Sequence, residues 1–134
     1  MNKITAAFQQ GKAFIPFLTG GDPDIETTEQ LVRAIAREAE GFIYCVSSLG
    51  VTGVRSQISS DIGEIIELAR QESGVPCAIG FGISTPQQAR DMAKLSDGVI
   101  VGSAIVKLIA QHGRDSVPVV AQYVREMKAA IADL

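Results

Sequence analysis

The sequence predicts an α/β domain in which four βα units follow one another and their strands form a parallel sheet. Three observations support this fold class. Short apolar runs of strand length alternate with longer stretches whose apolar residues recur at helical spacing. Glycine turns follow the last two strand-like runs, at Gly80 and Gly102. Regular alternation of strand and helix implies parallel strands joined by right-handed crossovers.

The first βα unit follows a short helical stretch at residues 4–8. Residues 13–18 are an apolar run of strand length, and a turn comes after them. We expect Asp22 to cap the next helix and Pro23 to occupy its first position, where no N–H is needed. The apolar residues of that helix lie on one face: Ile25, Val32, Ile35, Ala36 and Ala39.

The second unit begins with the apolar run 42–46, which a long polar and glycine-containing loop follows at residues 47–59. Loops after parallel strands carry function in this architecture. Asp61 and Glu64 have the spacing of a capping box, so we expect the second helix to start there. Its apolar face is Ile62, Ile65, Ile66 and Ala69.

The third unit has its strand at residues 75–79, and Thr85 with Gln88 forms a second capping box with a proline at the first helical position. The fourth strand is expected at residues 98–101, and the last helix from about Ser116. The apolar face of that last helix is Val117, Val120, Ala121, Val124, Met127 and Ile131.

The two glycine turns have the pattern of an anion-binding site. Glycine lets a backbone approach a ligand closely because it has no Cβ. Gly102 and Ser103 also open a helix-compatible segment whose free N–H groups favour an anion. Two consecutive strand ends of this kind match the phosphate cradle after the last two strands of a (β/α)8 barrel. Alternatively, these glycines only make tight turns, because isolated glycine motifs are weak indicators.

Size and composition limit this interpretation. The chain has 134 residues, enough for one domain but short of the ~250 of a full barrel, so we expect a single half-barrel domain over residues 1–134. A net charge of −3 offers no basic surface for nucleic acid. No run approaches the ~20 apolar residues of a membrane span, and the N-terminus lacks the pattern of a signal peptide. Cys45 and Cys77 lie in apolar runs, which predicts buried, reduced thiols in a cytoplasmic protein.

Four motifs go beyond the general pattern: FIPFLTGGDP at residues 14–23, GFIYCVSSLGVTG at 41–53, GFGISTP at 80–86 and GSAIVK at 102–107. Together they resemble the tryptophan synthase α-subunit family. By this resemblance, residues 1–40 correspond to the N-terminal helix and first βα unit of the family, and residues 41–134 to its sixth to eighth units. The second to fifth units have no counterpart, so the resemblance is to an internally truncated α subunit.

The resemblance implies a fold and a chemistry. Members of the family are (β/α)8 barrels and carbon–carbon lyases, which cleave indole-3-glycerol phosphate to indole and glyceraldehyde 3-phosphate in tryptophan biosynthesis. A glutamate at the end of the second strand and an aspartate in the following loop act as acid and base, and neither has a counterpart here. Such groups must lie within hydrogen-bond reach of the moving proton. We therefore expect a phosphate-binding half-site without lyase activity. Two alternatives remain: a working α chain whose carboxylates come from elsewhere, and a half-barrel with only a structural role.

The resemblance also assigns roles by position. The phosphate-binding positions are Gly53, Gly82, Gly102 and Ser103. The substrate-pocket positions are Phe17, Tyr44, Thr52 and Phe81. Phe17 and Phe81 have an alternative role as core residues, and the sole histidine, His112, is expected at the surface. We expect no catalytic residue, no metal and no cofactor. The expected ligand is a phosphorylated small molecule, or a phosphate or sulfate ion.

Assembly follows from the number of strands. Four parallel strands leave two open edges and an uncovered inner face, and about eight are needed to close around a filled interior. We therefore expect a homodimer in which the strands of one copy continue into those of the other and complete an eight-stranded barrel. In the alternative arrangement, the first strand lies beside the fourth and the half-barrels dimerise through their open faces. Docking of a β subunit is left open, because much of the docking surface of the family lies on absent loops.

Overall fold

The computed structural model describes residues 2–9, 11–19, 23–46, 55–80 and 82–134. Within these ranges, helices and strands alternate from residue 25 to residue 112, as the sequence predicts, and two further helical segments follow. The elements are α1 (Lys3–Gln9), α2 (Ile25–Glu38), β1 (Ile43–Val46), α3 (Arg55–Glu72), β2 (Cys77–Gly80), α4 (Pro86–Ala93), β3 (Gly98–Ile100), α5 (Ser103–His112), the 3-10 helix η1 (Gly113–Asp115) and α6 (Ser116–Ala130). None of the helices in the described ranges has the length and apolar character that crossing a membrane requires.

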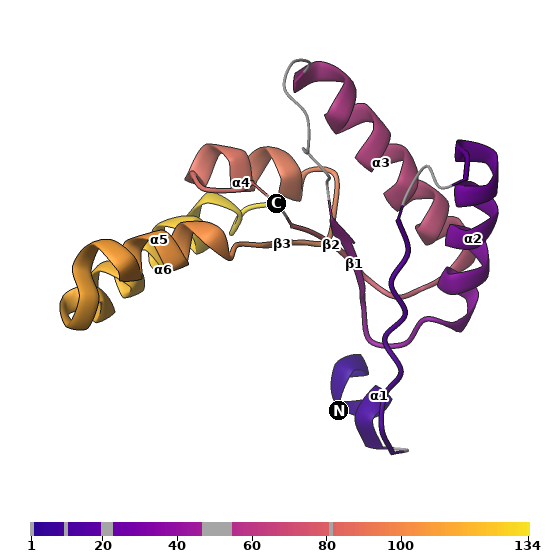
Figure 1. Cartoon of the computed structure of the whole chain (residues 1–134), viewed down its shortest axis with the longest axis horizontal. Coiled ribbons are helices and arrows are strands. Elements are labelled where there is room, and N and C mark those ends of the chain that lie inside the picture. Colours follow the sequence, from indigo (N-terminus) through magenta and orange to yellow (C-terminus); the bar gives the residue numbers. More distant parts are fainter. Residues whose placement is uncertain (1, 10, 20–22, 47–54, 81) are drawn as a thin grey trace.

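The three strands form one parallel sheet in the order β1, β2, β3. Val46 pairs with Gly80, and Gly80 pairs with Ile100. All three strands therefore end at the same edge of the sheet. In Figure 1, α2 and α3 lie to the right of the strands and α4, α5 and α6 to their left. The predicted parallel α/β arrangement is confirmed for the second, third and fourth units.

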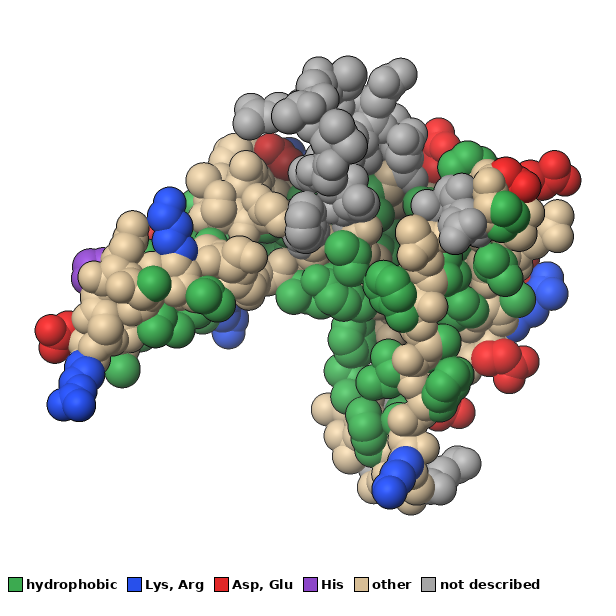
Figure 2. Space-filling view, in the orientation of Figure 1, with side chains coloured by type: hydrophobic (Ala, Val, Ile, Leu, Met, Phe, Trp, Pro, Cys, Tyr) green, Lys and Arg blue, Asp and Glu red, His purple; other side chains and the backbone are tan. Residues whose placement is uncertain are grey.

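The hydrophobic core lies on one face of this sheet. Cys45, Cys77 and Ile79 point to this face and are buried, because successive side chains of a strand point to opposite faces. The helices contribute most of the rest of the core, and Ile83 in the turn after β2 completes it. The buried apolar residues of the helices are Ala36, Ile62, Ile66, Ala69, Ala89 and Met127. The other face of β1 carries exposed apolar side chains, and Figure 2 shows hydrophobic side chains gathered at the centre of the molecule.

The predicted first strand is wrong: residues 13–18 form neither a strand nor a helix, and the sheet has three strands among the described residues. Figure 1 shows this segment as an extended stretch between α1 and α2. Phe14, Ile15 and Phe17 are 89%, 80% and 83% exposed. A strand with apolar side chains on both faces needs a covering layer on each side. The helices of this chain cover one face of the three-stranded sheet, and residues 13–18 lie outside this covered region.

The first helix cap also differs from the prediction. Helix α2 begins at Ile25, and its cap is Asp24, whose Oδ1 accepts a hydrogen bond from the N–H of Thr27 at 2.7 Å. Asp22, the predicted cap, lies outside the described residues. A cap must have an extended backbone, which Asp24 has at φ −156° and ψ 173°. The cap therefore lies two residues later in the sequence than predicted. The capping group is an aspartate side chain, as predicted.

Of the two predicted capping boxes, one is wrong and one is confirmed. Helix α3 begins at Arg55, so Asp61 and Glu64 lie inside it and do not start it. At α4, Thr85 Oγ1 accepts from the N–H of Gln88 at 3.2 Å, and Gln88 Oε1 accepts from the N–H of Thr85 at 3.2 Å. The reciprocal bonds satisfy two backbone donors that a helix start otherwise leaves free.

Cys45 and Cys77 are both free and buried, which confirms the prediction of two buried thiols. Burial raises the pKa of Cys45 to about 11, and the neighbouring Cys77 adds to this shift. Because the thiolate is the reactive form, a rise from 9.0 lowers the thiolate fraction at pH 8 by about 100-fold. We expect a disulfide reagent to label neither thiol at a measurable rate in the folded protein and both after denaturation. Rapid labelling of two thiols without denaturant would contradict the burial.

Asp97 ties the amino-terminal ends of β2 and β3 together. Its Oδ2 accepts from the N–H of Cys77 at 2.8 Å, its own N–H donates to Cys77 O at 2.9 Å, and Oδ1 pairs with Arg70 Nη2 at 3.0 Å. The hydrogen bond from Cys77, with help from Arg70, lowers the pKa of Asp97. The carboxylate therefore stabilises the fold above its ordinary pKa of 3.8, and this stabilisation is lost as the pH falls through the lowered value.

We expect Asp97→Ala to lower the free energy of unfolding at pH 7 by about 1–3 kcal/mol, because the N–H of Cys77 loses its acceptor. Asp97→Asn keeps a carbonyl acceptor and should cost less. Chemical denaturation at pH 7 and at pH 3 measures both effects. The difference between wild type and Asp97→Ala should shrink at the lower pH, and a difference that grows on acidification would contradict this assignment.

Candidate functional site

The register of the sheet brings the glycine turns together at its carboxyl edge. Gly80 and Ile100 are paired, and Gly82 and Gly102 each lie two residues beyond them. Gly82 has φ 73°, in the left-handed region that glycine adopts without strain, and it is exposed. The turn after β2 therefore contains a glycine in a conformation that suits it. This turn lies at the same edge of the sheet as the end of β3.

Helix α5 starts at this edge. Gly102 is its N-terminal cap residue, and Gly102 O accepts from the N–H groups of Ile105 and Val106 at 2.9 and 3.1 Å. Gly102 and Ser103 are exposed, and a Cβ added at Gly102 would meet no atom within 4 Å. No side chain of the described residues caps this helix end. The first backbone N–H groups of a helix lack carbonyl partners within it, so they are available to an acceptor from outside.

Tyr44 lies on the open face of the sheet, next to this edge. Its ring covers Gly80, where an added Cβ would be 2.8 Å from Tyr44 Cζ. Glycine at position 80 is therefore what allows the aromatic ring to rest on β2. Tyr44 itself is about half exposed, which leaves much of its surface available to another group.

The remaining predicted pocket residues have different outcomes. Phe17 belongs to the exposed segment before α2, so its alternative role as a core residue is wrong in this structure. Gly53, Thr52 and Phe81 lie outside the described residues. Within the described part of the chain, Gly82, Gly102 and Ser103 thus share one edge, and Tyr44 flanks it.

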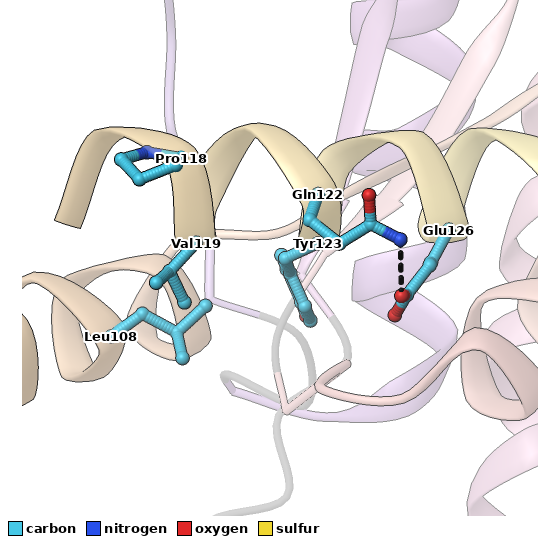
Figure 3. A pocket seen from close by; sticks show the side chains of 6 residues that line it. All are labelled: Leu108, Pro118, Val119, Gln122, Tyr123 and Glu126. Atoms are coloured by element: carbon cyan, nitrogen blue, oxygen red, sulfur yellow. Dashed lines mark hydrogen bonds between the residues drawn. The ribbon is translucent and has the colours of Figure 1, made fainter.

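A hollow of about 490 Å³ lies between α5 and α6, away from the predicted residues. Figure 3 shows Leu108 and Val119 pointing into it beside the ring of Tyr123, with a hydrogen bond of 2.8 Å from Gln122 to Glu126 along its rim. The hydroxyl of Tyr123 donates to Ser84 O at 2.8 Å and so joins α6 to the turn after β2.

Tyr123 is a positioning residue that the sequence prediction missed. The sequence feature that could have identified Tyr123 is its spacing of four residues from Met127, which is buried in the core. The predicted face instead included Val117 and Val124, which are exposed. Apolar residues lie on more than one side of α6, and local periodicity does not decide which side is buried.

Among the described residues, the carboxyl groups with a shifted pKa are all held ionised. In each of them the main cause is a donated hydrogen bond that lowers the pKa, as where Arg37 and Arg33 donate to Glu72. The five groups are Asp24, Glu72, Asp91, Asp97 and Asp133. A general acid at neutral pH needs a raised pKa instead. These carboxylates therefore serve the fold.

The predicted place of His112 agrees with the structure. His112 is exposed at the last position of α5, which confirms the surface role expected for it. A group of three or more His, Cys, Asp or Glu side chains able to hold a metal ion is not found within the described ranges.

A parallel sheet with a helix after each strand and glycine turns at its carboxyl edge is the arrangement of barrel proteins of the (β/α)8 class. Comparison with known proteins gives the family. The family model for the tryptophan synthase alpha chain matches residues 26–132. The chain belongs to this family.

Two curated tryptophan synthase alpha chains illustrate the relationship. The one from Lactiplantibacillus plantarum is 46% identical over 90% of this chain and 44% of its own length, and the one from Lacticaseibacillus casei is 37% identical over 96% and 46%. This chain thus spans less than half the length of the curated relatives it matches.

Solved structures agree with the sequence comparison. Tryptophan synthase subunit alpha from Campylobacter jejuni superposes with a TM-score of 0.59 at 35% identity, over 66% of this chain and 36% of that one. A structure of the tryptophan synthase α2β2 complex from Pyrococcus furiosus gives a TM-score of 0.61 at 29% identity, over 75% and 41%.

Proposed function

We propose that this chain keeps the phosphate-binding half of an α-subunit site and does not catalyse the lyase reaction. The observation that carries the proposal is the shared edge, where Gly82 and Gly102 follow paired strand ends and Ser103 opens α5. Free N–H groups at a helix start and the positive end of the helix dipole favour a phosphate. The contacts position a ligand and supply no acid or base.

The rest of the proposed site extends around this edge. Gly53 completes the phosphate-binding positions, and Thr52 closes over the ligand beside it. Tyr44, Phe17 and Phe81 offer aromatic surface to the organic part of the ligand. Support for this part comes from the family relationship and from the place of Tyr44 on the open sheet face.

The single domain at residues 1–134 is proposed to be a half-barrel, which a second copy completes. The Pyrococcus furiosus relative forms an α2β2 complex. A β subunit is a less favoured partner for this chain, which lacks the second to fifth units. The two free, buried thiols suit the reducing cytoplasm that we propose as its location.

Calorimetric titration tests the phosphate site. The probes are inorganic phosphate and glycerol 3-phosphate, with glycerol as the matched compound without a phosphate. We expect both phosphates to bind with dissociation constants on the order of 1 mM, since only a few hydrogen bonds contribute. Sulfate should compete, and glycerol should give no heat of binding. Equal signals from glycerol and glycerol 3-phosphate, or none from any phosphate, would overturn the proposal.

A further inference from the structure

One surface of the chain has apolar side chains that nothing in the described residues covers. We define this open face by the exposed apolar residues of β1, of the position just before it and of the segment before α2: Tyr44, Val46, Phe42, Phe14, Ile15 and Phe17. The β1 residues alternate with Ile43 and Cys45, which pack into the core. The segment differs, because consecutive side chains are exposed and so both of its faces are free. Figure 2 shows hydrophobic side chains gathered over the sheet and this segment.

The exposed area indicates how large the missing cover is. The chain has an accessible surface of 9328 Å², whereas a compact monomer of 14.2 kDa exposes about 6,800 Å². The excess is therefore roughly 2,500 Å². An obligate homodimer buries about 2,000–5,000 Å² in total, or about 1,000–2,500 Å² from each copy. One interface of that class is large enough to remove an excess of this size, which belongs to the whole chain and not to the open face alone.

The charge of the open face is compatible with pairing against itself. In a two-fold dimer the same patch meets its own copy, so a patch of one charge would repel itself. Residues 42–46 carry no charged side chain, and Lys12 is the one charge in residues 11–19. An acidic or basic partner would therefore find little complementary charge here. A second copy brings an equally large apolar surface.

We propose that a second copy of this chain covers the open face, with the segment at residues 13–18 of each copy buried between the two. Parallel sheets are normally covered on both faces, and the helices of this chain cover one. The partner supplies the second layer for β1 and for both faces of the segment. This inference rests on the half-barrel proposed above. It uses Tyr44 and Phe17, which the proposed pocket for the organic part of the ligand also includes, but it does not use the glycine turns that carry the phosphate site.

Phe14→Glu tests the interface with little risk to the fold, since Phe14 is 89% exposed. Val117→Glu is the matched control, because Val117 is 73% exposed and lies on α6, outside the open face. In sedimentation velocity at tens of micromolar, wild type and Val117→Glu should have twice the 14.2 kDa mass of one chain. Phe14→Glu should raise the dissociation constant at least ~100-fold, because each copy would bury an unpaired charge. The circular dichroism of both variants should match wild type.

Hydrogen exchange on the wild-type protein gives a second measurement that needs no variant. The amides of residues 13–18 should be protected at high protein concentration and should exchange freely on dilution below the dissociation constant. Wild-type protein that stays monomeric, amides that remain unprotected in the dimer, or equal effects of Phe14→Glu and Val117→Glu would each overturn the inference. The two proposals can be contradicted separately. A monomeric protein that binds glycerol 3-phosphate would contradict only the proposed interface, and a dimer that binds no phosphate would contradict only the proposed ligand site.

Discussion

Purified protein is expected to release no indole from indole-3-glycerol phosphate above the uncatalysed background. General acids and bases typically contribute about 10²–10⁴-fold each, and under the proposed function neither carboxylate of the family has a counterpart in this chain. The carboxyl groups with shifted pKa values cannot replace them. Their pKa values are lowered by the hydrogen bonds they accept, as in Asp24 with Thr27 and Asp97 with Cys77. The expected loss relative to a complete α chain is therefore at least about 10⁴-fold.

The measurement is a continuous indole assay on protein produced in a host that lacks its own α subunit. It is run with and without a β subunit, because partner binding could assemble a site that the isolated chain lacks. A complete α chain is the positive control under the same conditions. Turnover that follows this protein through purification, in either condition, would show that carboxylates from elsewhere complete the site.

The sequence pattern was sufficient to predict those strands and helices whose apolar side chains are covered by other parts of this chain. The apolar runs at β2 and β3 lie against α3 and α4, the helices that directly precede them, so strand propensity and burial agree. The run at residues 13–18 has the same pattern and forms no strand. Its pattern indicates a strand buried on both faces, but the layers that would bury it are not in this chain. The sequence pattern of a segment indicates which of its faces are suited to burial. It does not indicate whether another layer is present to bury them.

Helix starts show a different limit. Asp22 and Asp24 both precede the apolar face of α2, and the structure has Asp24 as the cap, with an extended backbone. At α3, the spacing of Asp61 and Glu64 satisfies the capping pattern inside a helix that begins at Arg55. Such a pattern recurs by chance in helices rich in acidic residues. Thr85 was predicted correctly because Pro86 fixes the first helical position as well.

The part of the candidate site that is formed by backbone groups could be predicted from the sequence. Gly82, Gly102 and Ser103 were identified from their order after two strand-like runs, and the parallel register places them at one edge. Tyr123 was missed, because its hydroxyl meets a carbonyl 39 residues earlier in the chain. Contacts between distant segments depend on how helices pack, and the sequence pattern of one helix does not contain that information.

Gly102→Val is expected to abolish binding of glycerol 3-phosphate, with a dissociation constant raised at least ~10-fold, while the fold is retained. The space above Gly102 is open, so valine would meet no atom of the protein. Its φ of −122° is negative, so the substitution does not force valine into the left-handed region. The valine side chain would instead occupy the space in which a phosphate approaches the N–H groups of α5. A small loss of stability, about 1 kcal/mol or less, is expected because valine is a poorer N-terminal cap than glycine.

Gly74→Val is the matched control for this variant. Gly74 is exposed and equally open, but it precedes β2 and so lies at the amino-terminal edge of the sheet. We expect Gly74→Val to bind glycerol 3-phosphate as wild type does, and both variants to give the wild-type circular dichroism spectrum. Gly102→Ala should fall between wild type and Gly102→Val, since a single methyl group blocks less of the approach. Undiminished binding by Gly102→Val would show that phosphate does not sit at the start of α5, and equal losses in Gly102→Val and Gly74→Val would show that the effect comes from stability and not from the ligand site.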